Sequence, residues 1–328
     1  MKEISEKKAI YMMVVCAVLW STGGFLIKLV PWQPLAIAGF RSLFAACVFM
    51  VYFIKMRFHL VINRDTLLCG LMLSATTLLF VTANKLTTSA NAIILQSTAP
   101  IFIMLLSVLL FGCRYRRVEY AMVLIVFIGI ALFFFDDLDR GGLLGNLAGL
   151  ASGVCMASMF LLSSRLPDDQ SSQSALLMGM LMTALTGIPT IAISRVHFTP
   201  VSVGVLLLLG FFQLGLPYVL YGLAVRRCSP LSCSLIGMLE PLLNPIWVFF
   251  MVGELPGVLS LIGGAIVLIT VTIWVWYGHR AARQQMPELL PETEQAEGQM
   301  MDGTEDLQEK TGIKGVCQAE RNGRFRKG

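Results

Sequence analysis

The most constraining feature of the sequence is a succession of long apolar runs that leaves almost no room before residue 278 for a water-soluble domain. An α-helix needs roughly 17–25 apolar residues to cross a hydrocarbon core about 30 Å thick. Charged or polar clusters, glycine and proline separate the runs. They predict ten transmembrane helices, at 9–28, 34–54, 66–86, 91–111, 118–135, 143–164, 174–194, 202–224, 231–252 and 257–277.

Composition supports an all-α integral membrane protein without a cofactor. Hydrophobic residues make up 56% and charged residues 14%, against about 45–50% and 25% in soluble domains. The net charge of +5 is small and the basic residues are scattered between apolar runs, which argues against nucleic-acid binding. No CxxC pair is present and the three histidines fall at or near the ends of runs, so we expect no metal site.

Lysine and arginine predict the orientation, because basic loops are retained in the cytoplasm. With the N-terminus inside, the inner segments hold 14 of these residues and the outer segments four. We therefore expect a multi-pass protein of the inner or plasma membrane with both termini cytoplasmic. Residues 278–328 are rich in charge and poor in aromatics, which predicts a cytoplasmic, disordered tail.

An internal repeat divides the apolar region into two halves. A shift of 141 residues superposes Ala83–Gly112 on Ala224–Gly253, so that Pro100 falls on Pro241. A shift of 135 lays the segment that begins at Trp20 over the segment that begins at Cys155.

The repeat predicts two five-helix units, at 9–136 and 143–277, and an odd number of helices inverts the second unit in the membrane. Inverted repeats that enclose a midplane site are typical of secondary transporters. The alternative is a duplication retained only for packing.

Glu240 is the most informative side chain, because it lies near the centre of the ninth run. An ionised carboxylate there costs several kcal/mol unless it is paired or hydrated. Pro241 and Pro245 each remove a backbone hydrogen bond, so they predict a kink or break between Glu240 and Asn244, as Pro100 does in the first half. The carboxyl is either a proton-coupling or substrate-binding group, or a structural group bonded to a neighbouring helix.

Arg41 lies about one third of the way into the second run. A guanidinium does not give up its proton in a protein, so this side chain must find a partner or reach water. Snorkelling to the outer surface, toward the acidic run 136–139, is favoured over substrate contact, and both readings stay open.

Further polar side chains within the runs are candidates for a pathway through the membrane. Each alone is more often structural, since such groups commonly bond the backbone of a membrane helix. The candidates are Trp20, Thr76, Asn84, Asn91, Gln96, Gln213, Tyr218 and Asn244. No GxxxxGK[ST] signature is present, so a gradient must supply the energy.

The sequence resembles the drug/metabolite transporter superfamily, in its ten-helix EamA-type branch. The matching segments follow one another in order through both halves. They are Leu19-Trp20-Ser21, Phe40–Ala46, Ala90-Asn91-Ala92 with Ala99-Pro100, Leu239–Leu242, Gly253-Glu254 and Gly263-Gly264-Ala265. One departure is Cys113, where the family pattern often has a glutamate.

The resemblance implies a transporter and not an enzyme. Its substrates would be small metabolites, namely amino acids or related amphipathic compounds, with export the favoured direction and the proton a candidate coupling ion. It implies a cavity formed mainly by the third, fourth, eighth and ninth helices, in a monomer or homodimer within the lipid bilayer. A membrane-embedded enzyme and a non-transporting channel or receptor are the alternatives.

Overall fold

The computed structural model describes residues 6–111, 142–190, 197–225, 236–237, 239–253 and 257–285, with short stretches between 117 and 132. All regular secondary structure in these residues is helical. The first half contains α1 Glu6–Ser21, α2 Gly23–Leu29, α3 Pro34–Met56, α4 Arg64–Leu86, α5 Ser89–Gln96 and α6 Ala99–Phe111. The second contains α8 Leu143–Ser163, α9 Asp169–Gly187, α11 Pro200–Leu208, the π-helical η1 Leu209–Gly215, α12 Leu216–Ala224, α14 Leu239–Val252 and α15 Val258–Gln285.

Local sequence signals fix several helix ends. Asn63 accepts a bond from the backbone N–H of Thr66, whose hydroxyl accepts one in return from the Asn63 N–H, so a capping box starts α4. The side chain of Asp168 accepts from the backbone N–H of Ser171 at the start of α9. Arg57 ends α3 in a left-handed conformation, with φ of 55°. Polar loops thereby separate helices that are long enough to cross a bilayer.

Six helical segments among the described residues are long and apolar enough to cross a membrane. They are Lys8–Leu29, Pro34–Met56, Arg64–Leu86, Ser89–Leu109, Leu143–Ser163 and Pro200–Ala224. Six of the ten predicted runs are thus matched. The run at 118–135 lies largely outside the described residues, and α14 and α15 cover the described part of the last two runs. Because α15 continues to Gln285, the predicted tail boundary at residue 278 falls inside a helix.

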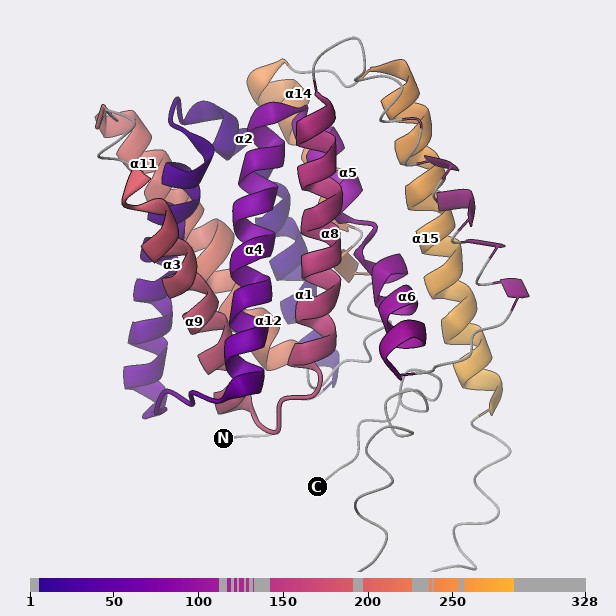
Figure 1. Cartoon of the computed structure of the whole chain (residues 1–328), viewed down its shortest axis with the longest axis horizontal. Helices are drawn as coiled ribbons and strands as arrows, with labels where there is room; N and C mark the ends of the chain where they lie inside the picture. The colour runs from indigo at the N-terminus through magenta and orange to yellow at the C-terminus, as the bar shows by residue number, and fades with distance from the viewer. Residues whose placement is uncertain are drawn as a thin grey trace, which may run out of the picture.

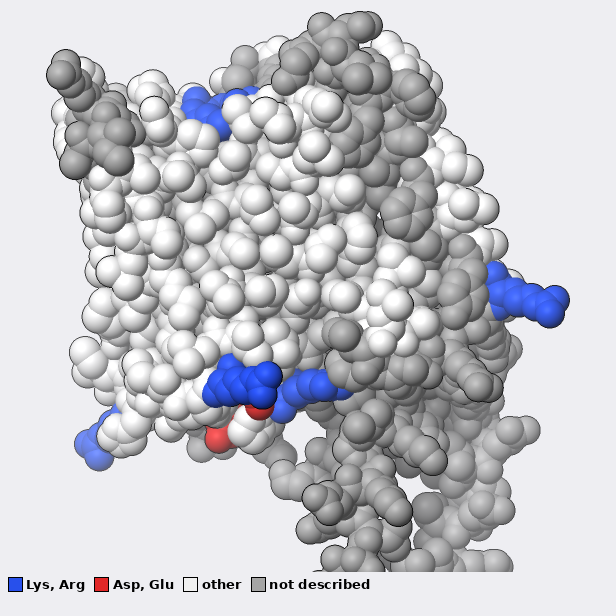
Figure 2. Space-filling model, in the orientation of Figure 1, with Lys and Arg blue, Asp and Glu red and all other residues white. Residues whose placement is uncertain are grey.

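The distribution of apolar and polar side chains is that of a protein embedded in a lipid bilayer. Ile54 is 79% exposed and Phe250 74%, whereas Arg41 is 2% exposed and Asn84 is fully buried. Figure 2 shows a broad white face without charge, with lysine and arginine above and below it and one further basic side chain projecting at the right edge. Apolar side chains outside and polar side chains inside are expected where the surrounding solvent is hydrocarbon.

The helices stand side by side, with their connections at two opposite ends (Figure 1). At one end the backbone N–H of Val61 donates to the hydroxyl of Ser174, 3.0 Å away. At the other end the indole N–H of Trp32 donates to the carbonyl of His197 at 3.1 Å. The loops after α3 and after α8 therefore share one end, as the orientation prediction groups them. Which end faces the cytoplasm stays a prediction.

The helix α9, which covers most of the described part of the predicted run at 174–194, is not among these six segments. It lies against α3, α4 and α12, and its first turns carry the buried polar residues Ser171–Ser174. A methyl group added at Gly39 of α3 would lie 2.7 Å from the backbone of Gly187. Close backbone contact of this kind is how small residues join membrane helices, so α9 is held among other helices and needs little lipid-facing surface.

Candidate functional site

The first membrane span is interrupted between α1 and α2. Thr22 separates the two helices, and its hydroxyl donates back to the carbonyl of Leu19 at 2.7 Å. The neighbouring carbonyls are bonded by amide side chains from the second half of the chain. Gln213 donates to the carbonyl of Trp20 at 3.4 Å, and Asn244 donates to that of Ser21 at 2.8 Å. Interrupted backbone at membrane depth is tolerated where protein or water supplies such partners.

Two glycines make room for these amides. A methyl group at Gly23 would lie 2.6 Å from the side-chain nitrogen of Gln213, and one at Gly24 would collide with the amide of Asn244. The side-chain amides therefore approach the break only because both positions lack a Cβ atom.

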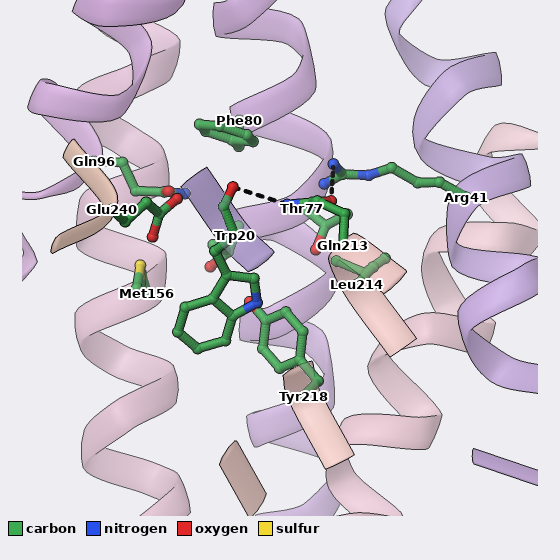
Figure 3. Close-up of a pocket in the computed structure, with 11 residues that line it drawn as sticks. Trp20, Arg41, Thr77, Phe80, Gln96, Met156, Gln213, Leu214, Tyr218 and Glu240 are labelled. Carbon is green, nitrogen blue, oxygen red and sulfur yellow. Dashed lines mark hydrogen bonds between the residues drawn. The ribbon is translucent and has the colours of Figure 1, made fainter. Parts of the chain in front are cut away.

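A small pocket lies beside this break (Figure 3). Both halves of the chain line it. The lining residues are Trp20, Arg41, Thr76, Thr77, Phe80 and Gln96 from the first half and Met156, Gln213, Leu214, Tyr218 and Glu240 from the second. The cavity has a volume of about 30 Å³, which is room for about two water molecules. This conformation is therefore contracted relative to the size of a metabolite.

Arg41 is buried at one side of the pocket, and the predicted preference for snorkelling is wrong. The side chain is 2% exposed, and its Nη1 donates to the Oε1 of Gln213 over a long 3.4 Å. Gln213 belongs to the π-helical turn η1, a rare geometry often found at functional sites. One glutamine thus links the guanidinium to the broken backbone at Trp20. The acidic run 136–139 lies outside the described residues.

Glu240 lines the pocket from the opposite side (Figure 3). It stands in the first turn of α14 and is half-buried. No ion pair joins it to Arg41, although the structure describes both residues. An acid and a base therefore face a shared space without neutralising each other by direct contact.

The break that was one of two expectations for the ninth run, beside a kink, is not found in the part of that run that the structure describes. The helix α14 continues from Leu239 to Val252 through Pro245, so the backbone is not broken between Glu240 and Asn244. Pro100 is the second residue of α6 and follows the turn at 97–98. A proline at the start of a helix removes an N–H that has no helical partner anyway.

A chain of hydrogen bonds supports the pocket near Gln96. Its side-chain nitrogen donates to the hydroxyl of Ser152 at 2.6 Å, and that hydroxyl donates to the carbonyl of Thr76 at 3.1 Å. Gln96 is the last residue of α5, before the turn that leads to α6. A second interrupted span therefore contributes to the same site.

Aromatic rings close another side. The ring centroids of Trp20 and Tyr218 are 5.2 Å apart, and those of Trp20 and Tyr221 are 6.1 Å apart. The indole N–H of Trp20 is buried and has no hydrogen-bond partner in the part of the chain that the structure describes.

The structure brings seven of the ten predicted pathway residues to the pocket wall. The other three are asparagines nearby. Asn244 holds the break in the first span, Asn84 accepts from the hydroxyl of Ser89 at 3.3 Å, and Asn91 lies in the first turn of α5.

Three lining residues were not predicted, namely Phe80, Met156 and Leu214, whereas Thr77 is the polar neighbour of the candidate Thr76. All three are apolar, and an apolar side chain within an apolar run gives no sign in the sequence that it lines a pocket. Among the described residues no cluster of His, Cys, Asp and Glu could hold a metal ion.

Comparison with known proteins agrees with this architecture. The model of the EamA-like transporter family matches twice, at residues 7–135 and 143–276. A solved structure titled only "Crystal structure of protein" superposes with a TM-score of 0.60 at 18% identity, over 83% of this chain and 99% of the other, which shows a shared fold. No curated protein matches the sequence. Since the family model covers both halves, the chain belongs to the EamA-like transporter family of the drug/metabolite transporter superfamily.

Proposed function

We propose that the chain is a secondary transporter that moves small metabolites, amino acids or related amphipathic compounds, out of the cell by alternating access. One observation carries the proposal. Arg41 and Glu240 come from different halves and line the same pocket between apolar spans. A charge at such a depth is costly and commonly marks a substrate or ion pathway.

The interrupted spans supply a means of opening the pocket. The break between α1 and α2 is held by amides of η1 and α14, which belong to the other half. A movement of one half against the other would exchange these bonds and would change the pocket. Discontinuous helices at a repeat interface are used in this way by many secondary transporters.

Glu240 is the group to which we assign the coupling proton. Its carboxyl lines the pocket without an ion pair to Arg41 in the described structure, so it is available to a proton or to a cationic group of the substrate. Access from alternate sides would let it load a proton on one side and release it on the other. The rival role is a structural carboxyl that only joins neighbouring helices.

Reconstitution in liposomes tests both the activity and the proton. A metabolite-resolved uptake and efflux screen, with and without a pH gradient, is expected to show saturable counterflow, which a channel or a receptor does not give. Glu240→Gln should abolish accumulation driven by the gradient. The matched control is Asp65→Asn, an acid-to-amide change at an exposed position of α4, which should leave transport unchanged.

Two outcomes would count against the proposal. If no solute shows saturable counterflow, the transport function is refuted. Full activity of the Glu240→Gln variant with unchanged pH dependence would remove the carboxyl from the coupling step, while a transporter that uses another ion would stand.

A further inference from the structure

We propose that the Arg41 side of the pocket is an anion subsite that binds a carboxylate group of the substrate, with the indole N–H of Trp20 as a second donor. The inference rests on the proposed transport function and adds the chemical group that the site recognises. Three features of the described residues support it: the unused donors of Arg41, a second buried donor on Trp20, and the position of Glu240 across the pocket.

The first feature is the unused hydrogen-bonding capacity of Arg41. A guanidinium carries five N–H donors and no acceptor. The Nη1 bond to Gln213 is long, and the Nε atom has no partner among the described residues. A buried cation held only for structure would need its donors satisfied by protein acceptors, because each unsatisfied one is costly.

The second feature is another buried donor in the pocket wall, where Trp20 lies beside Tyr218 (Figure 3). The indole N–H of Trp20 is also buried and without a partner in the described structure, and Trp20 lines the same pocket. Gln213 contacts both residues, because its oxygen accepts from Arg41 and its nitrogen donates to the backbone carbonyl of Trp20. A carboxylate offers only acceptors and is the natural complement to such a pair.

The third feature is the position of the opposing charge. Glu240 stands across the pocket from Arg41 (Figure 3). In its deprotonated form Glu240 would repel an anionic group from the α14 side and direct it toward Arg41. The space of about 30 Å³ is sufficient for a head group alone, so the rest of the solute requires the opened conformation.

Binding of matched compounds by the purified protein tests the subsite. The probes are alanine, leucine and phenylalanine, each as the free acid, as the amide that lacks the carboxylate, and as the deaminated acid that lacks the ammonium group. Ligand-induced shifts of the thermal midpoint report apparent affinity. The carboxylate forms should stabilise the wild-type protein at about 10- to 100-fold lower concentration than the amides, as the strength of charged hydrogen bonds suggests.

The variants separate recognition from folding. Arg41→Gln should lose the preference for acid over amide, and Arg41→Lys should retain part of it. Lys55→Gln removes the same charge from an exposed position at the end of α3 and should behave as wild type. Trp20→Phe keeps the ring and removes the N–H, so it should weaken carboxylate binding about 3- to 10-fold and serves as the test if Arg41→Gln does not fold.

Either of two results would overturn the subsite. One is an Arg41→Gln variant that keeps the wild-type preference for the acid over its amide. If Arg41→Gln does not fold, the same preference in Trp20→Phe counts in its place. The other is a wild-type protein that no carboxylate stabilises more than its amide. Carboxylate binding that depends on Arg41, without counterflow in liposomes, would leave the subsite intact and refute the transport function instead. Counterflow without any preference for the acid would support the transport function and refute the subsite.

Discussion

Replacing Gly24 by alanine tests whether the break in the first span is held by Asn244. The new methyl group would collide with the Asn244 amide and displace it from the carbonyl of Ser21, 2.8 Å away. Asn244 is fully buried, so an unsatisfied amide there costs about 1–3 kcal/mol. Alanine gains about 0.5–1 kcal/mol over glycine in a helix. We expect a net loss of about 1–2 kcal/mol in the free energy of unfolding.

A double-mutant cycle in mixed detergent micelles isolates the contact. Asn244→Ala alone leaves the Ser21 carbonyl without its donor, and adding Gly24→Ala to that variant should cost nothing further, because the collision is gone. The coupling free energy should therefore be about 1 kcal/mol or more in favour of the double variant. Gly204→Ala is the matched control, since a methyl group at that helical position meets nothing within 4 Å.

The reasoning is refuted if Gly24→Ala is as mild as Gly204→Ala, or if the two single losses simply add. In either case the position of the Asn244 amide would not depend on the absence of a Cβ atom at Gly24, and other contacts would stabilise the break.

Two further variants probe the surrounding bundle. Gly187→Val should drive α9 away from Gly39, whose backbone lies against it, and should destabilise the protein by about 1–3 kcal/mol. Thr186→Val, at an exposed neighbouring position, should be nearly neutral. Equal losses of stability for the two variants in thermal unfolding would reject the packing argument. Lys85→Met removes a 2.6 Å bond from the ammonium group to the carbonyl of Val30. At this half-buried position the loss should cost about 1 kcal/mol and should broaden the distribution of spin-label distances between the loops after α2 and α4. An unchanged distribution would show that the bond does not hold this end closed.

The fold was predictable where one kind of signal was enough. Long apolar runs determine a membrane helix almost by length alone, so the spans at 34–54 and 66–86 differ from α3 and α4 by two residues or fewer at each end. The interruption of the first span was not predicted. Its residues, from Trp20 to Gly24, contain no proline, and the break depends on amides that lie about 190 to 220 residues further along the chain.

The candidate site was predictable through its polar members. Arg41, Glu240 and Gln213 stand out because charge and amides are rare in apolar runs. The direction of Arg41 was not predictable, since snorkelling and burial give the same one-dimensional pattern. The prolines were informative about position and misleading about effect. The helix α14 continues through both Pro241 and Pro245.

The bonds from the Gln213 and Asn244 amides to the first span also bear on how the chain folds during synthesis. The carbonyls of Trp20 and Ser21 receive their donors from residues 193 and 223 positions later. The N-terminal helix therefore enters the bilayer long before its hydrogen bonding can be completed. Insertion and final folding of that helix are separate events, and the second is deferred until the ribosome has nearly finished the apolar part of the chain.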